Sequence, residues 1–241
     1  MKKLFIVKVG TTFPATAEQY GDFDKWTLAG LGTANIDTHI LDVEHGASLP
    51  NPTECAGVIV TGSHSMVTDN LAWSKKMEVW IPSLLEAKIP FLGICYGHQL
   101  LAQAMGGIVG FHPAGKEIGT VEIQLLQEYV DDNLLRFLPN RLYVHVTHSQ
   151  TVLRLPPNAA RLASSAHESN HIFRIGDSAW GLQFHPEYDA PIMRSYILEQ
   201  AKELESAERD VSEILRTVKE TPAAAGILKN FAHIVLQGSK S

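Results

Sequence analysis

The sequence predicts an α/β fold: a mostly parallel sheet with helices on both faces, extra β-strands in the second half and a helical C-terminal tail. Two continuous apolar runs, residues 57–60 and 89–94, are typical of strands that are buried on both faces, as in parallel sheets. Strand-like and helix-like segments alternate over the first two thirds of the chain, and residues 190–237 carry apolar positions at helical spacing.

The first half supplies the elements of the parallel sheet. A β-rich run at residues 4–9 and an alternating segment at 36–43 predict two strands that join the two buried runs. Residues 73–87 predict a helix that Pro82 kinks or divides, because proline lacks the N–H that a helix interior needs. Residues 99–105 predict a second helix, which ends at the glycine pair that follows it.

The second half changes character toward β-structure. Short apolar stretches predict strands at residues 121–126, 142–147, 160–164, 171–175 and 180–184. The tail predicts helices with a break at Thr221-Pro222. We therefore expect a domain over residues 1–190 and a helical C-terminal extension, residues 191–241, packed on it.

The apolar face of the extension leaves two hypotheses open. Its apolar residues recur at helical spacing: Ile192, Ile197, Leu198, Val211, Ile214, Leu215 and Val218. The first hypothesis is packing on the parent domain. The second is a surface for a partner protein or for a second copy of the chain, which would make a homo-oligomer.

Composition excludes several classes of protein. The 241 residues carry a formal net charge of −6 and no run of basic residues, so we expect no nucleic-acid partner. The two cysteines, Cys55 and Cys95, are too few for a disulfide framework or a thiolate metal cage, so we expect a reducing compartment and no metal. No apolar stretch has the length of a signal peptide core or a membrane helix, so we expect a cytoplasmic protein with no membrane partner.

Cys95 is the candidate nucleophile. The segment Gly93-Ile94-Cys95-Tyr96-Gly97 fits a nucleophile elbow, with cysteine at the turn between a buried strand and a helix. Such a turn presents the side chain to open space, and the helix N-terminus places partial positive charge beside the sulfur, which favours the thiolate. The alternative is a buried structural cysteine on a tight turn. Cys55 lacks the setting between strand and helix, and we interpret it as a residue that fills the core.

His185 and Glu187 are the candidate base and its orienting carboxylate. They close the apolar strand at 180–184, so they are expected at a sheet edge, where α/β active sites gather. Pro186 holds His185 in extended backbone, and residues two apart in extended chain point to the same side. Glu187 can then fix one tautomer of the imidazole and stabilise its protonated form. A surface turn is the alternative interpretation.

Several segments combine into one pattern. They are Gly93-Ile94-Cys95-Tyr96-Gly97-His98-Gln99-Leu100-Leu101-Ala102 with Gly106-Gly107, Gln183-Phe184-His185-Pro186-Glu187, Val60-Thr61-Gly62-Ser63 and Val146-Thr147-His148-Ser149. The pattern closely resembles the class I (triad) glutamine amidotransferases over about residues 4–190. It looks like a free-standing member, similar to a GMP synthase glutaminase or a γ-glutamyl peptidase.

The resemblance implies a flavodoxin-like domain with Cys95, His185 and Glu187 as a catalytic triad. It implies that Gln99 and the backbone near Tyr96 and Ser149 hold the glutamine. It also implies that N–H groups near Gly62 and Ser63 complete the oxyanion hole. The sequence departs from the family at Gly62-Ser63-His64, where Gly-Gly-Pro or Gly-Pro-Gly is usual, and at Thr147-His148-Ser149.

The function implied is cysteine-dependent hydrolysis of the glutamine side-chain amide through a γ-glutamyl thioester, with no cofactor. Three hypotheses remain open at this point. Ammonia is passed to a separate synthetase subunit, or the chain acts alone as a γ-glutamyl peptidase or hydrolase, or it is a non-catalytic binding module. The intact residues Cys95, His185 and Glu187 argue against the last.

Overall fold

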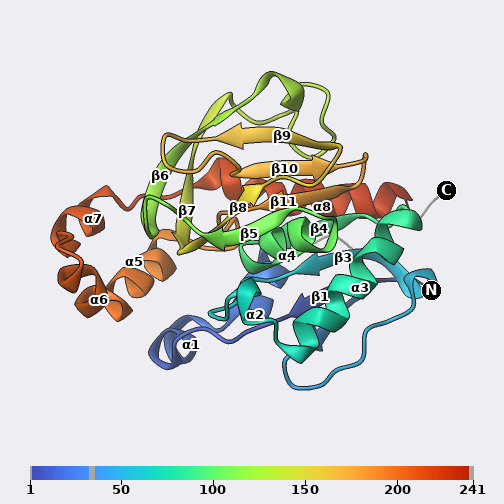
Figure 1. The fold of residues 1–241 in the computed structure, drawn as a ribbon, viewed down its shortest axis with the longest axis horizontal. Helices are drawn as coiled ribbons and strands as arrows, with labels where there is room; N and C mark the ends of the chain where they lie inside the picture. The colour runs from blue at the N-terminus through green and yellow to red at the C-terminus, as the bar shows by residue number, and fades with distance from the viewer. Residues whose placement is uncertain (1, 33–35, 239–241) are drawn as a thin grey trace.

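A computed structural model describes residues 2–32 and 36–238, so the last three residues of the predicted extension lie outside the described chain. A nine-stranded sheet forms its centre (Figure 1). A separate two-stranded antiparallel sheet pairs β5 (Ile108–Phe111) with β8 (Gln150–Arg154).

The first five strands of the large sheet are parallel. They are β2 (Thr38–Asp42), β1 (Lys3–Lys8), β3 (Cys55–Val60), β4 (Phe91–Ile94) and β11 (Ala179–Leu182). The other four are antiparallel and extend the sheet: β10 (Ile172–Ile175), β9 (Ala159–Ser164), β6 (Glu117–Leu125) and β7 (Arg141–His148). The predicted fold class, with extra strands in the second half, is confirmed.

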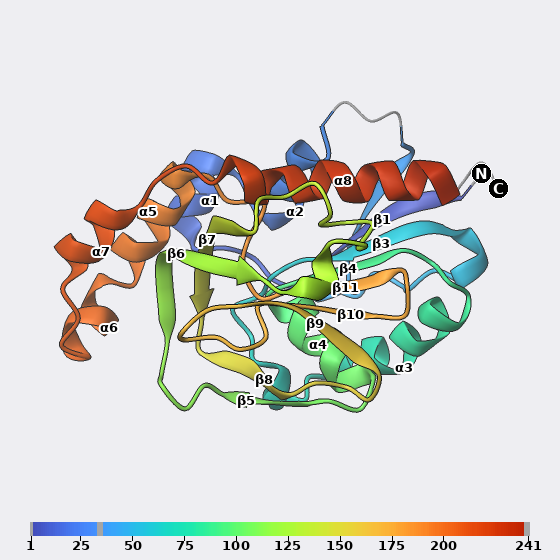
Figure 2. The ribbon, with the colours of Figure 1, turned by 90° about the horizontal axis from the view of Figure 1, so that it is seen from above.

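Helices cover both faces of the parallel strands (Figure 2). On one side lie α1 (Pro14–Tyr20), α2 (Phe23–Gly30) and α8 (Pro222–Gly238); on the other lie α3 (Ala72–Glu86) and α4 (Tyr96–Ala104). Alternation along β1 explains the two layers, because Leu4 and Ile6 join one apolar cluster with α8, whereas Phe5 and Val7 join another with α3 and α4.

The tail folds as four helices: α5 (Ala190–Glu199), α6 (Ala201–Ser206), α7 (Val211–Thr217) and α8. The break predicted at Thr221-Pro222 is confirmed, since α8 begins at Pro222. Within α8 the buried residues recur at three- and four-residue intervals and pack on the sheet: Ala224, Ile227, Leu228, Phe231, Ala232 and Val235.

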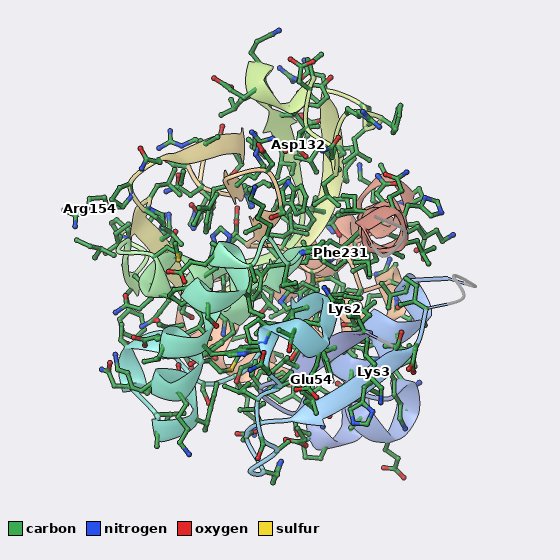
Figure 3. All side chains as sticks on the ribbon, turned by 90° about the vertical axis from the view of Figure 1, so that its right-hand side faces the viewer. Lys2, Lys3, Glu54, Asp132, Arg154 and Phe231 are labelled. Atoms are coloured by element: carbon green, nitrogen blue, oxygen red, sulfur yellow. The ribbon has the colours of Figure 1, made fainter. Side chains whose placement is uncertain are left out.

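Trp180 of β11 links α8 to the antiparallel half of the molecule through Phe231 and Asp132. Figure 3 labels these two partners. Its ring lies edge-on to Phe231 at 6.4 Å between centroids. Its indole N–H is directed at both carboxylate oxygens of the buried Asp132, at 3.1 and 3.0 Å. This contact fixes β11, the strand that leads to His185.

The structure differs from the sequence-based expectation in three places. Pro82 does not divide α3, because the helix buries Met77, Ile81 and Leu84 in the core and this packing outweighs the lost hydrogen bond. Helix α4 begins at Tyr96, directly after Cys95. Helices α1 and α2 and strands β5 and β8 were not predicted.

Within the described residues, no helix combines the length and the apolar character that crossing a membrane would need.

Candidate active site

Cys95 occupies a sharp turn between β4 and α4. Its backbone has φ 48° and ψ −95°, and residues other than glycine rarely adopt a positive φ. A Cβ added at Gly97 would lie 2.6 Å from the carbonyl oxygen of Val60, and one at Gly93 would collide with the backbone of Gly97. The flanking glycines are therefore required by close backbone approach, and they let the turn form.

The sheet register brings the turn to the second motif. Strands β4 and β11 are parallel neighbours, with Gly93 opposite Gly181 and Ile94 opposite Leu182. The amide of Cys95 donates to the carbonyl of Leu182 at 2.8 Å. Because parallel strands end at the same edge of a sheet, the residues that follow β11 lie beside the sulfur.

His185 and Glu187 form a buried pair at this edge. The Nδ1 atom of His185 lies 2.7 Å from Oε1 of Glu187, and the two residues are 2% and 8% exposed. The amide of His185 donates to the carbonyl of His145 at 2.8 Å, which anchors the segment to β7. A turn at residues 186–187 brings the two side chains together, since the amide of Tyr188 donates to the carbonyl of His185 at 3.4 Å. The pair forms as expected, but the extended backbone that the sequence predicted for it is wrong.

The charged form of His185 is stabilised in place. Burial lowers the pKa of the imidazole, but the carboxylate of Glu187 and the neighbouring sulfur of Cys95 raise it to about 10. Glu187 accounts for the tautomer, since it faces Nδ1, whereas Nε2 has no hydrogen-bond partner among the described residues. The imidazolium form of His185 is therefore favoured beside Cys95.

Two aromatic rings hold the imidazole. Tyr188 stacks on His185 with ring centroids 4.1 Å apart, and Phe23 lies roughly parallel to it at 6.3 Å. On the remaining side, a Cβ at Gly62 would come within 2.9 Å of Cε1 of His185. The turn that contains Gly62 and Ser63 thus packs directly against the imidazole.

A cavity of about 290 Å³ opens above the sulfur. Its walls come from segments that are far apart in the sequence. The residues that line it include Phe13, Ser63, His64, Cys95, Tyr96, Gln99, Lys116, Thr147, Ser149, His185, Tyr196, Gln200 and Glu203. Among the described residues, no group of three or more histidine, cysteine or acidic side chains is arranged to hold a metal ion.

Comparison with known proteins identifies the family. The family description "Glutamine amidotransferase class-I" matches residues 17–203, which is most of the chain.

This chain belongs to the class-I glutamine amidotransferases.

The expectation that it is an enzyme of this type is confirmed. The amidotransferase is 33% identical to a GMP synthase (glutamine-hydrolysing) of Aeropyrum pernix over 180 residues, which are 72% of this chain and 33% of that protein. A GMP synthase of Porphyromonas gingivalis is 38% identical over 133 residues, or 54% of this chain and 24% of the relative. The chain thus spans a third or less of the length of these curated relatives.

Solved structures match it over nearly its whole length. A glutamine amidotransferase from Thermotoga maritima has a TM-score of 0.76 and 26% identity, and the match covers 98% of this chain and 99% of the other. One from Methylobacillus flagellatus also has a TM-score of 0.76 and 26% identity, covering 100% and 95%. The predicted flavodoxin-like fold of this family is therefore confirmed.

The structure brings most of the predicted ligand-binding residues of this amidotransferase to the cavity. Ser63, Tyr96, Gln99 and Ser149 line it, whereas Gly62 lies just outside, against His185. The side-chain N–H groups of Gln99 are already used, since Nε2 donates to the carbonyl of Gln150 at 2.8 Å and to Oε1 of Gln183 at 3.1 Å. Its carbonyl oxygen is the group left for a ligand.

Sequence reasoning missed two groups beside the amidotransferase's sulfur. Gln183 directs Nε2 at Cys95 Sγ over 3.7 Å, and the carbonyl oxygen of Thr147 lies 3.9 Å from the same sulfur. Both residues stand in segments that carry the family resemblance, residues 183–187 and 146–149, so a signal was present, although their approach to the sulfur was not predicted.

His64 was also missed, although it stands where the sequence departs from the family. Its Nε2 lies 3.3 Å from the hydroxyl of Tyr196, which in turn lies 2.6 Å from the hydroxyl of Thr12. Phe13 packs on its ring at 4.4 Å. Burial, followed by the nearby charge of His185, lowers the pKa of His64, so this ring is held neutral beside the Gly62-Ser63 turn.

Proposed function

We propose that this amidotransferase hydrolyses the side-chain amide of glutamine with Cys95 as nucleophile, His185 as acid and base, and Glu187 as its orienting carboxylate. One observation carries the proposal: a cysteine on an elbow lines the same cavity as an imidazole that is itself held by a carboxylate, with 2.7 Å between Nδ1 and Oε1. Nucleophile, base and orienting group in this relation are the signature of covalent acyl transfer.

The proposed mechanism assigns each proton transfer to a named group. The Cys95 thiolate attacks the amide carbon, and the oxyanion accepts hydrogen bonds from backbone N–H groups at Ser63 and Tyr96. His185 gives its proton to the departing ammonia, which leaves a γ-glutamyl thioester. A water then loses its proton to His185 and attacks the thioester, releasing glutamate and the thiolate. Loss of one oxyanion donor costs on the order of 3 kcal/mol of barrier.

The destination of the ammonia is part of the proposal. The curated relatives are GMP synthases of which this chain matches 33% and 24%, and this supports transfer of ammonia to a separate synthetase subunit. We also propose that residues 1–190 form the amidotransferase domain, that residues 191–241 are a helical extension of it, and that the protein works in the cytoplasm without a cofactor.

A specific observation favours a second candidate, a stand-alone γ-glutamyl peptidase or hydrolase. Phe13, His64 and Tyr196 form a cluster of rings on the cavity wall, with centroids 4.4 to 5.9 Å apart. Ammonia has no apolar part that could pack against these rings, whereas an organic amine or peptide leaving group has one.

The test is a substrate panel on the purified chain without added partner. Glutamine and γ-glutamyl dipeptides are compared by release of ammonia or amine, and the acyl-enzyme is trapped with hydroxylamine. We expect turnover that Cys95→Ala abolishes. Activity that appears after a synthetase is added supports the subunit, and fast peptide cleavage supports the peptidase. No turnover and an unreactive Cys95 would overturn both and leave a binding module.

A further inference from the structure

The cavity contains a charged pair that the chemistry above does not use. Lys116 Nζ lies 2.9 and 3.0 Å from the two carboxylate oxygens of Glu203. Both residues line the same cavity as Cys95. Lys116 is the one lysine or arginine among the described residues that line it.

The two partners are held very differently. Lys116 directly precedes β6, its backbone carbonyl accepts a hydrogen bond from Arg209 Nη1 at 2.8 Å, and its side chain is 19% exposed. The side chain of Glu203 is 63% exposed. The cation is thus built into the cavity wall, whereas the carboxylate reaches it from solvent.

Glu203 reaches the cavity from the helical tail. Tyr196, Gln200 and Glu203 follow one another at spacings of four and three residues, which places them on one side of the α5–α6 segment, and all three line the cavity. Gln200 Nε2 lies 3.4 Å from Oγ1 of Thr147, so this side of the tail is joined to the wall that flanks the sulfur.

We propose that Lys116 binds a carboxylate of the γ-glutamyl substrate, and that Glu203 occupies this carboxylate position while the cavity is empty. The inference rests on the proposed function, because every γ-glutamyl compound carries an α-carboxylate and γ-glutamyl amino acids carry a second one on the departing amine. An ion pair with one exposed partner is weak, because solvent screens the attraction between its charges. A substrate carboxylate delivered into the cavity can therefore displace Glu203 from Lys116.

The two partners make opposite predictions, and this separates binding from mere structure. Lys116→Met removes the ammonium group that binds the carboxylate, so we expect the KM for a carboxylate substrate to rise about 10- to 100-fold with little change in kcat. Glu203→Gln removes the competitor, so we expect the KM to fall by about two- to fivefold. A pair that served only to fasten α6 would be broken equally by both variants, with effects of the same sign.

Four substrates show which carboxylate is recognised. Glutamine carries the α-carboxylate, and γ-aminobutyramide lacks it. The dipeptide γ-glutamylglycine adds a carboxylate on the leaving side, and γ-glutamylmethylamide removes that one. If Lys116→Met raises the KM for glutamine but not for γ-aminobutyramide, the α-carboxylate is bound. If it raises the KM for γ-glutamylglycine alone, the leaving group's carboxylate is bound.

Three further variants control the measurement. Lys116→Arg keeps the charge and should restore most of the binding. Arg141→Met and Glu122→Gln both break one other surface ion pair, which joins β7 to β6 at 3.5 Å outside the cavity, and should leave every KM unchanged. Thermal unfolding of each variant shows whether the fold is retained.

Binding is also measured without turnover. Titration calorimetry of γ-glutamylglycine against Cys95→Ala, with and without Lys116→Met, should show affinity about 10-fold or more lower when the lysine is absent. If the wild-type protein turns over no substrate but binding still depends on Lys116, the proposed function is wrong and this inference stands. Turnover that is indifferent to Lys116, or KM effects of equal sign in Lys116→Met and Glu203→Gln across all four substrates, would overturn it.

Discussion

The phenol ring of Tyr188 is stacked on the imidazole of His185, with centroids 4.1 Å and planes 19° apart. Because Nδ1 of His185 is bound to Glu187, the imidazole is fixed both in its plane and against its face. Proton transfer requires donor and acceptor within hydrogen-bond reach, so a ring that cannot tilt keeps Nε2, which has no partner among the described residues, in a fixed position.

Tyr188→Ala should therefore lower kcat by about tenfold, since the stack that holds the ring is worth about 0.5–1.5 kcal/mol and its loss leaves a gap into which the imidazole can tilt. Tyr188→Phe keeps the ring and should stay within about threefold of the wild type. Steady-state kinetics, normalised by titration of the reactive thiol, measures both. Wild-type kcat in Tyr188→Ala would show that stacking plays no part in positioning.

Glu187→Gln should lower the pKa of His185 from about 10 toward its ordinary value of 6.5, because the raising carboxylate charge is removed. The imidazolium would then be lost as pH rises through neutrality, where the wild type still retains it. We expect kcat to fall by at least about 100-fold. An NMR titration of the His185 ring between pH 5 and 11 reads the shift directly, and an unchanged titration would contradict the electrostatic role.

Gly62→Ala should impair catalysis more than stability. The added methyl would sit 2.9 Å from Cε1 of His185, so the imidazole or the Ser63 turn must move. We expect kcat to fall by about 10-fold or more, as small displacements of reacting groups are costly. Gly226→Ala is the matched control: nothing lies within 4 Å of its Cβ position, and it lies inside α8. It should keep full activity and gain about 0.5–1 kcal/mol of stability.

The free energy of unfolding should fall as the solution is acidified below pH 6.5. Burial lowers the pKa of His98 to about 3, of His145 to about 4 and of His171 to about 3. Between those values and 6.5 the unfolded chain binds protons that the folded chain does not. Each histidine can therefore contribute a loss of up to about 1.4 kcal/mol per pH unit. Urea unfolding at pH 7.5, 6 and 5 measures the slope.

His98→Met tests this assignment, because it removes one titrating group while keeping an unbranched, neutral side chain in the core. Its unfolding free energy should depend less steeply on pH than that of the wild type, whatever its absolute stability. An equal slope would mean that His98 does not remain neutral in the folded protein.

The residues Cys95, His185 and Glu187 could be predicted because their signals are local. A glycine-flanked turn between strand and helix identifies the first, and a His-Pro-Glu motif directly after a buried strand identifies the other two. The cavity wall could not be predicted in this way. Lys116 and Glu203 are 87 residues apart, and Thr12 and Tyr196 are 184 apart, so their meeting depends on tertiary folding.

The elements that were missed are short or weakly patterned. Helix α1 has the sequence PATAEQY and buries only Thr16, so it carries no apolar stripe. Strand β8 has three buried residues followed by two exposed ones in place of strict alternation, and β5 is four residues long. Both are stabilised by pairing with each other on the side of the main sheet.

The positive φ of Cys95 has a consequence for how this protein can be improved. A backbone in that region costs on the order of 1 kcal/mol for any residue with a Cβ, and glycine escapes the cost. Cys95→Gly would thus remove the backbone strain that is present in every molecule with the nucleophile. Selection for thermal robustness alone would favour losing the nucleophile, so a stabilisation campaign on this scaffold must screen for turnover in every round.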